Sequence, residues 1–186
     1  MTTRDFIDPR TPSTATTPRG AGNPGAARHP VVLGDWGTSR LRLYLATGAR
    51  AIAVTVVDEC AGPGIGALTE SASDTLRKAL APWRQRYPIS RVVLCGMAGS
   101  RNGLLEVPYL SMPVEPARWL ERCGILRDAD LDIAVGAGIG GENTGGVPDA
   151  MRGEEAQIFG ALQLDPTLAR GRHLLALPGK IGRAHV

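Results

Sequence analysis

Residues 31–57 alternate apolar and polar positions over three short segments. V-V-L-G-D-W begins at Val31, R-L-R-L-Y-L at Arg40 and A-I-A-V-T-V-V at Ala51. Alternation with a period of two favours half-buried strands, and Gly37-Thr38 and Thr47-Gly48 are typical of the turns between them. The pattern predicts an antiparallel meander of three strands.

Helical spacing begins further along. Leu68, Leu76, Leu80 and Trp83 recur at intervals that predict a helix over Thr69–Arg86, capped by Ser73 or Asp74. The later segments predict, in order, a strand over Arg91–Gly96, a helix over Glu115–Cys123, a strand over Leu131–Val135, a long glycine loop, a helix over Gly153–Leu164 and a strand starting at His173.

The predicted order is βββαβαβα followed by a new strand. This order requires an α/β fold with a mixed sheet and helical crossovers. It is similar to the first lobe of the actin-like ATPase fold, which is ribonuclease H-like and is shared by hexokinases and glycerol kinase. The strand at His173 would then begin a second lobe.

The composition indicates one domain with a hydrophobic core, preceded by a polar N-terminal tail. The chain has 186 residues, 43% of them hydrophobic, whereas residues 1–29 are rich in Thr, Pro, Gly, Ala and Arg and are expected to be disordered. No run of about 18 apolar residues and no signal-peptide core occurs, so we expect a cytoplasmic protein that does not enter a membrane. Cys60, Cys95 and Cys123 form no C-x-x-C pair, and we expect small buried or half-buried thiols.

The basic pI arises at the two ends of the chain. Between Pro30 and Gly179 there are 15 basic and 16 acidic residues. A nucleic-acid partner would need a basic surface on the folded part. The charge pattern therefore argues against nucleic-acid binding.

The first segment with candidate chemistry is G-D-W-G-T-S-R, residues 34–40, which we place in the turn between the first two strands. Phosphoryl transfer needs a carboxylate that holds Mg²⁺ and nearby amides and hydroxyls that approach phosphate oxygens. Asp35 supplies the carboxylate, while Gly37, Thr38 and Ser39 supply a tight turn, amides and hydroxyls. A plain hairpin with an Asp in its turn is the alternative.

The second segment is M-R-G-E-E-A-Q, residues 151–157, at the start of the last predicted helix. One of its two carboxylates could take the proton from a sugar hydroxyl that attacks the γ-phosphate. Glu154 and Glu155 would also suit the dipole of a helix N-terminus without any catalytic role. Both interpretations stay open.

The third segment is G-M-A-G-S-R-N-G, residues 96–103, which follows a strand, where ligand loops of α/β sheets lie. Gly99 permits close approach of a ligand, and Ser100, Arg101 and Asn102 could bind hydroxyls or a carboxylate, because the guanidinium fork donates two parallel hydrogen bonds. An ordinary exposed loop is the alternative.

Taken together, GDWGTSRLRLYL, LCGMAGSRNG followed by VPYL, and MRGEEAQIFGA resemble the 2-dehydro-3-deoxygalactonokinases in order and spacing, from about Val31 to Gly179. The resemblance implies ATP- and Mg²⁺-dependent phosphorylation of the terminal hydroxyl of 2-dehydro-3-deoxygalactonate in galactonate breakdown. It implies that Asp35 is linked to Mg²⁺, with Gly37, Thr38 and Ser39 beside the nucleotide. Glu154 is the candidate base and Glu155 the second choice. The candidate substrate-binding residues are Arg40, Gly99, Ser100, Arg101, Asn102 and Arg152.

The resemblance stops after Leu177-Pro178-Gly179, where the family continues with T-H-S-K-W, its second phosphate loop. The last six residues, IGRAHV, are the translation of a common sequencing-adapter string. We therefore expect a tail at 1–29, a first kinase lobe at 30–172, the start of a truncated second lobe at 173–179 and a non-native tail at 180–186. The chain would then be an inactive N-terminal fragment that lacks its adenosine pocket.

Two alternatives differ from this interpretation. The chain could be another actin-like sugar kinase that acts on a hexose or an amino sugar. It could instead be a non-catalytic binding module that keeps a single lobe. The stereochemistry of the sugar acid and the oligomeric state are not predicted.

Overall fold

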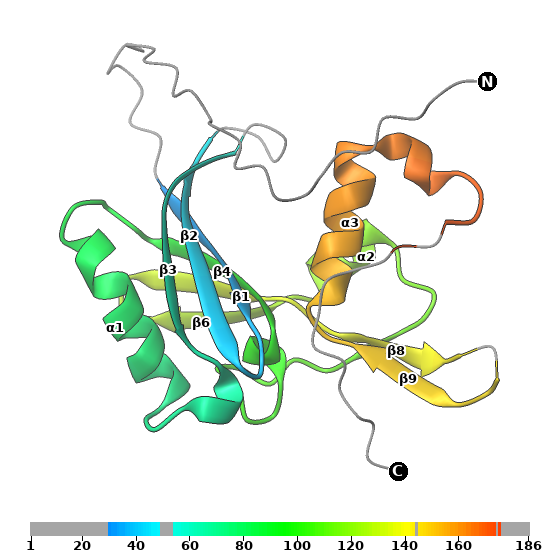
Figure 1. The fold of residues 1–186 in the computed structure, drawn as a ribbon, viewed down its shortest axis with the longest axis horizontal. Helices are drawn as coiled ribbons and strands as arrows, with labels where there is room; N and C mark the ends of the chain where they lie inside the picture. The colour runs from blue at the N-terminus through cyan, green and yellow to red at the C-terminus, as the bar shows by residue number, and fades with distance from the viewer. Residues whose placement is uncertain (1–29, 49–53, 144, 174, 176–186) are drawn as a thin grey trace, which may run out of the picture.

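A computed structural model of the chain describes residues 30–48, 54–143, 145–173 and 175 (Figure 1). Its main element is a six-stranded mixed sheet in the order β3-β2-β1-β4-β7-β6. The sheet strands are β1 (Val31–Trp36), β2 (Arg40–Thr47), β3 (Thr55–Pro63), β4 (Arg91–Gly96), β6 (Gly124–Asp128) and β7 (Leu131–Val135). Strands β1 to β3 form an antiparallel meander, β1, β4 and β7 are mutually parallel, and β6 is antiparallel to β7.

A second region contains a small sheet and the last helix. The small sheet has the order β5-β8-β9, from β5 (Leu110–Ser111), β8 (Ile139–Glu142) and β9 (Pro148–Met151). The helices are α1 (Ala72–Arg84), α2 (Pro116–Glu121) and α3 (Glu154–Leu164). Short 3₁₀ turns are η2 (Ile65–Ala67), η3 (Met97–Gly99) and η4 (Pro166–Ala169). Figure 1 shows α1 on one side of the molecule and α3 with β8 and β9 on the other.

The core lies between the large sheet and α1. Leu41, Leu43 and Leu45 alternate with polar residues along β2 and are fully buried, as the period-two pattern requires. Leu76 and Leu80 of α1 pack against the same face of the sheet. Burying a large apolar side chain stabilises a fold by about 1.5–3 kcal/mol, so this layer is the main source of stability.

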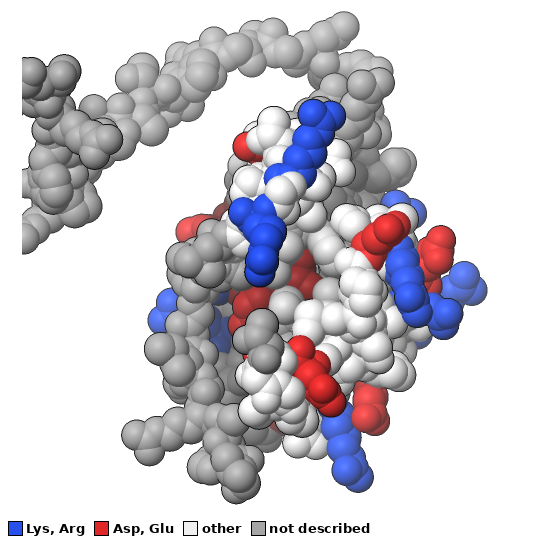
Figure 2. Space-filling model, turned by 90° about the vertical axis from the view of Figure 1, so that its right-hand side faces the viewer, with Lys and Arg blue, Asp and Glu red and all other residues white. Residues whose placement is uncertain are grey.

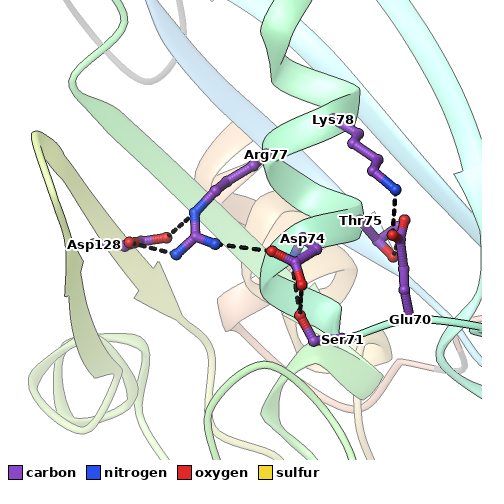
Figure 3. Close-up of polar contacts among 7 residues, drawn as sticks. All are labelled: Glu70, Ser71, Asp74, Thr75, Arg77, Lys78 and Asp128. Carbon is purple, nitrogen blue, oxygen red and sulfur yellow. Dashed lines mark hydrogen bonds and ion pairs between the residues drawn. The ribbon is translucent and has the colours of Figure 1, made fainter.

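Polar contacts fix the N-terminal turn of α1 and tie the helix to the edge of the sheet (Figure 3). The Ser71 hydroxyl accepts the Asp74 amide hydrogen at 3.0 Å, so Ser71 is the N-cap. Arg77 donates to both carboxylate oxygens of Asp128 on β6, at 3.0 and 2.8 Å. The expected cap at Ser73 or Asp74 is wrong, because α1 begins at Ala72 and both residues lie inside its first turn.

The described residues form an α/β fold with a mixed sheet and three α-helices, as expected, but β5, β6, β8 and β9 were not predicted. The expected glycine loop after Val135 instead forms the β8–β9 hairpin, and Gly124, expected to end a helix, begins β6. The helix expected over Glu115–Cys123 is confined to Pro116–Glu121, and the third strand is shifted to Thr55–Pro63. Such short strands carry little periodicity, so the sequence pattern does not reveal them.

Several expectations fall on residues that the structure does not describe. The tail at 1–29 and the proposed non-native segment at 180–186 lie outside the described residues, as does almost all of the strand expected from His173. Within the described part, Cys60, Cys95 and Cys123 are free and half-buried, as expected.

Candidate functional site

A cleft of about 440 Å³ lies at the carboxyl ends of β1 and β4, where the large sheet meets the first turn of α3. Ligand sites of α/β sheets are found at such strand ends. The residues that line the cleft are Asp35, Gly37, Thr38, Ser39, Arg40, Arg42, Gly96, Met97, Tyr109, Ala150, Arg152, Gly153, Glu154 and Gln157. The structure therefore brings segments 34–40 and 151–157 together.

Asp35 forms the first wall of the cleft from within β1. It lies in the strand rather than in the turn where we expected it, directly opposite Arg42 in the β1–β2 ladder. Arg42 Nη2 donates to Asp35 Oδ2 at 2.5 Å, and this hydrogen bond raises the pKa of Arg42. The Asp35 side chain is 31% exposed and that of Arg42 53%, so the pair is open to a ligand.

The 37–40 turn is braced from outside the cleft. The carbonyl oxygen of Gly37 accepts the Ile65 amide hydrogen at 3.0 Å, and that of Thr38 accepts the Gly66 amide hydrogen at 2.9 Å. These bonds to η2 hold one side of the turn. Gly37, Thr38, Ser39 and Arg40 line the cleft from its other side.

Two glycines allow the strand ends and α3 to approach one another. Gly96 has φ 81°, and a Cβ there would lie 2.8 Å from the carbonyl oxygen of Trp36 and 3.2 Å from Asp35 Oδ1. Gly153 has φ 121°, and a Cβ there would lie 3.2 Å from the Cα of Gly96. Both conformations strain any residue with a side chain. The close contact of these two glycines sets Glu154 in the same cleft as Asp35.

The two adjacent carboxylates of α3 lie in different environments. Glu154 is half-buried and lines the cleft, and its Oε2 accepts the Arg152 amide hydrogen at 3.1 Å. Glu155 is fully buried, does not line the cleft, and accepts the Gly153 amide hydrogen at 2.7 Å through Oε2. Burial raises the pKa of Glu155, and its second oxygen has no hydrogen-bond partner.

Arg152 forms part of the cleft wall with Tyr109. Its guanidinium carbon lies 4.1 Å from the centre of the Tyr109 ring, a cation–π distance. Arg152 Nη2 donates to the carbonyl oxygen of Val107 at 2.9 Å, while Nε and Nη1 are buried without a hydrogen-bond partner. Arg152 thus connects the start of α3 to the 107–109 segment and adds positive charge beside Glu154.

The 99–102 loop does not line the cleft. Gly99 is buried and packs against the Arg152 guanidinium, and the Ser100 hydroxyl donates to the carbonyl oxygen of Met97 at 2.8 Å. Arg101 and Asn102 are exposed outside the cleft. The loop turns back on itself through hydrogen bonds after η3, and so only Gly96 and Met97 of segment 96–103 reach the cleft.

Sequence reasoning missed Arg42 and Tyr109. A signal for Arg42 exists, because it follows Arg40 by two residues in an alternating strand and must share a face with it. Tyr109 follows a buried Val107 in a segment without periodicity, and only the fold shows that it meets Arg152.

Among the described residues, no group of three or more His, Cys, Asp and Glu side chains could hold a metal ion by itself. None of the described helices is both long and apolar enough to span a membrane.

Known proteins resemble this chain over much of its length. The family model 2-keto-3-deoxy-galactonokinase matches residues 35–183. A Rhizobium meliloti (strain 1021) protein, a candidate 2-dehydro-3-deoxygalactonokinase DgoK1, is 30% identical over 145 residues, which cover 78% of this chain and 45% of that protein. The Escherichia coli (strain K12) 2-dehydro-3-deoxygalactonokinase is 30% identical over 146 residues, with the same two coverages.

A solved structure gives the same result. The crystal structure of a candidate 2-dehydro-3-deoxygalactonokinase from Sinorhizobium meliloti superposes with a TM-score of 0.57 and 30% identity, over 72% of this chain and 42% of that one. The chain spans less than half the length of the relatives that it matches. Because the family model covers most of the residues, including every segment that lines the cleft, the chain belongs to the 2-keto-3-deoxy-galactonokinase family.

Proposed function

We propose that this chain provides one half of an ATP-dependent kinase that phosphorylates the terminal hydroxyl of 2-dehydro-3-deoxygalactonate in galactonate breakdown. One observation carries the proposal: Asp35, the 37–39 turn and Glu154 line a single cleft although they are more than 100 residues apart in sequence. These are the group types that phosphoryl transfer requires. The proposed substrate is taken from the names of the relatives.

The Asp35 side of the cleft fits Mg²⁺ and phosphate. Mg²⁺ keeps several waters and takes one or two protein carboxylates together with substrate phosphates, so the half-buried Asp35 carboxylate, which lines the cleft, is a suitable donor. When bound, Mg²⁺ supplies charge neutralisation at the phosphates. Thr38 and Ser39 line the same cleft and carry hydroxyls as further oxygen groups, and the hydrogen bond from Arg42 keeps the Asp35 carboxylate oriented.

Glu154 is proposed as the general base. Its half-buried side chain lines the same cleft as Asp35, where the sugar hydroxyl and the γ-phosphate would meet. It takes the proton of the hydroxyl as that oxygen attacks phosphorus. Arg40 and Arg152 line the same cleft and favour an anionic substrate over a neutral sugar. We assign no role in the cleft to Gly99, Ser100, Arg101 or Asn102.

We propose further that residues 30–172 form the first lobe of an actin-like ATPase fold, that 173–179 begin a second lobe and that the kinase is cytoplasmic. The mixed sheet with helical crossovers and the 45% coverage of the relatives support this division. Positioning between two lobes supplies most of the catalysis in such a kinase. The 186-residue chain alone is therefore expected to lack measurable turnover.

The experiment compares this chain with the extended protein, meaning residues 1–179 joined to the continuation read from the genomic contig. ADP release is measured with ATP, Mg²⁺ and either 2-dehydro-3-deoxygalactonate, glucose or glucosamine. We expect turnover by the extended protein with the sugar acid alone. Turnover with glucose or glucosamine only would instead support a hexose or amino-sugar kinase. A natural stop directly after Gly179 would support a non-catalytic module, and robust turnover by the 186-residue chain would contradict the two-lobe account.

A further inference from the structure

We propose that Glu155 is a positioning residue: it holds the Arg152–Gly153 turn so that Glu154 and Arg152 face the cleft. This inference rests on the proposed function, because it assigns a role relative to the base and the cleft of that kinase. It replaces the alternative in which Glu155 itself is the base.

The Glu155 carboxylate lies outside the main cleft. Glu155 is fully buried, and it lines a small apolar pocket of about 170 Å³ that shares no lining residue with the main cleft. The other residues lining that cavity are Met112, Pro113, Val114, Ile139, Met151, Ile158 and Phe159. A sugar hydroxyl in the main cleft cannot reach this carboxylate, so Glu155 does not meet the geometric requirement for a base.

The buried Glu155 carboxylate makes a hydrogen bond to the backbone at the start of α3. Glu155 Oε2 accepts the amide hydrogen of Gly153, the residue that immediately precedes α3, at 2.7 Å. A buried bond of this kind between a carboxylate and a helix-terminal amide satisfies a donor that the helix itself leaves unpaired. It also fixes the orientation of the peptide between Arg152 and Gly153.

The peptide between Arg152 and Gly153 precedes a backbone conformation that is strained for residues with a side chain. Gly153 has φ 121° and touches Gly96, the residue that also abuts Asp35. Glu154, the next residue, returns its own side chain to the Arg152 amide at 3.1 Å. A change of the Gly153 turn would therefore move the base and the cleft arginine together.

Arg152 and Glu155 also lie in one buried electrostatic environment. The Arg152 charge acts to lower the pKa of Glu155, against the larger and opposite effect of burial. Arg152 Nε and Nη1 and Glu155 Oε1 are all buried without hydrogen-bond partners. Buried polar groups without hydrogen-bond partners lower stability, and these three atoms all belong to residues at the start of α3, beside the cleft.

The test uses three variants. Glu155→Gln keeps an oxygen acceptor for the Gly153 amide, Glu155→Leu removes it at similar volume, and Ile133→Val in β7 is a control that lowers stability without touching the turn. The first readout is amide hydrogen exchange of Gly153 in the 186-residue chain, with the β4 amides as internal reference. We expect slow exchange in the parent and in Glu155→Gln and at least tenfold faster exchange in Glu155→Leu.

The second readout is kinetics of the extended protein. Glu155→Leu is expected to lower kcat/KM at least tenfold, Glu155→Gln to recover most of that loss with an unchanged pH profile, and Ile133→Val to stay within twofold of the parent. Equal Gly153 exchange in the parent and Glu155→Leu would overturn the proposal. So would loss of turnover in Glu155→Gln as complete as in Glu155→Leu. If the extended parent shows no sugar-acid kinase activity, the proposed function fails and the exchange measurement alone decides the positioning role.

Discussion

Helices α1 and α3 are held in place by different forces. α1 buries Leu76, Leu80 and Trp83 against the large sheet, whereas Glu155 is the only fully buried residue of α3. The apolar residues of α3 that remain half-buried are Ala156, Ile158, Phe159, Ala161 and Leu162. Figure 2 shows the side of the molecule on which α3 and the β8–β9 hairpin lie in Figure 1, where charged and uncharged residues are both present.

The cleft lies where these two regions meet. Asp35 belongs to the well-packed sheet, so its position follows from apolar burial in the core. Glu154 depends on the first turn of α3, which is fixed by a few polar contacts and two glycines. The metal side of the site is thus expected to be more robust to packing mutations than the base side.

Removal of the base gives the largest expected effect on the α3 side. Glu154→Gln in the extended protein should lower kcat by about 10²–10⁴-fold, the usual contribution of general base catalysis. The exposed Glu121→Gln in α2 is the matched control, with kcat expected within twofold of the parent. ADP release measures both, and equal activity of the two variants would remove Glu154 from the chemistry.

Truncation of one leucine in each helix tests the packing difference itself. Leu80→Ala in α1 removes a fully buried side chain and should lower the free energy of unfolding by about 2–5 kcal/mol. Leu162→Ala in α3 removes a half-buried one and should cost less than about 1.5 kcal/mol. Urea unfolding of the 186-residue chain measures both values. Equal losses would show that α3 is as firmly packed as α1.

The pH dependence of stability sharpens the role of Glu155. Burial raises its pKa, with smaller effects from Glu154 and Arg152, so its stabilising contribution is complete below the unfolded value of about 4 and is lost as pH rises through the folded value. Glu155→Gln cannot ionise and should therefore gain stability relative to the parent between pH 4 and pH 7. Urea unfolding at both pH values is the measurement. A difference that does not change with pH would contradict a raised pKa.

The smallest expected effect is a gain in α3. Gly160 lies inside the helix, and a Cβ there would meet nothing within 4 Å. Gly160→Ala should therefore stabilise the chain by about 0.5–1 kcal/mol through helix propensity alone. A measured loss in urea unfolding would show that α3 packs closely at this position.

The large sheet could be predicted from the sequence because its apolar residues alternate. Strands β1, β4 and β7 have the predicted bounds, since each joins a β-branched apolar run to a clear boundary. The β8–β9 hairpin was missed because Gly136–Gly141 and the residues after it contain too few apolar positions to show a period. Pairing with a neighbouring strand, which the sequence alone does not reveal, decides their structure.

The site was predictable as segments and less so as side chains. Asp35 and Glu154 lie in motifs whose residue types suggest phosphate chemistry, and the fold brings both to one cleft. The sequence alone could not separate Glu154 from Glu155, because the two are adjacent and only burial distinguishes them. It also named Arg101 beside Arg152 as a candidate substrate-binding residue, whereas only Arg152 of these two lines the cleft, because the course of the loop is not known from the sequence.

The central claim is that the cleft binds Mg²⁺-linked phosphate at Asp35 for transfer to a sugar acid. The most direct measurement is ADP release by the extended protein as a function of Mg²⁺ concentration, for Asp35→Asn and for the exposed Asp132→Asn in β7 as its control. The account predicts that Asp35→Asn lowers kcat by about 10³-fold and needs more Mg²⁺ for half-maximal turnover, with an unchanged melting temperature. Turnover of Asp35→Asn within a few-fold of the parent, at the same Mg²⁺ requirement, would contradict it.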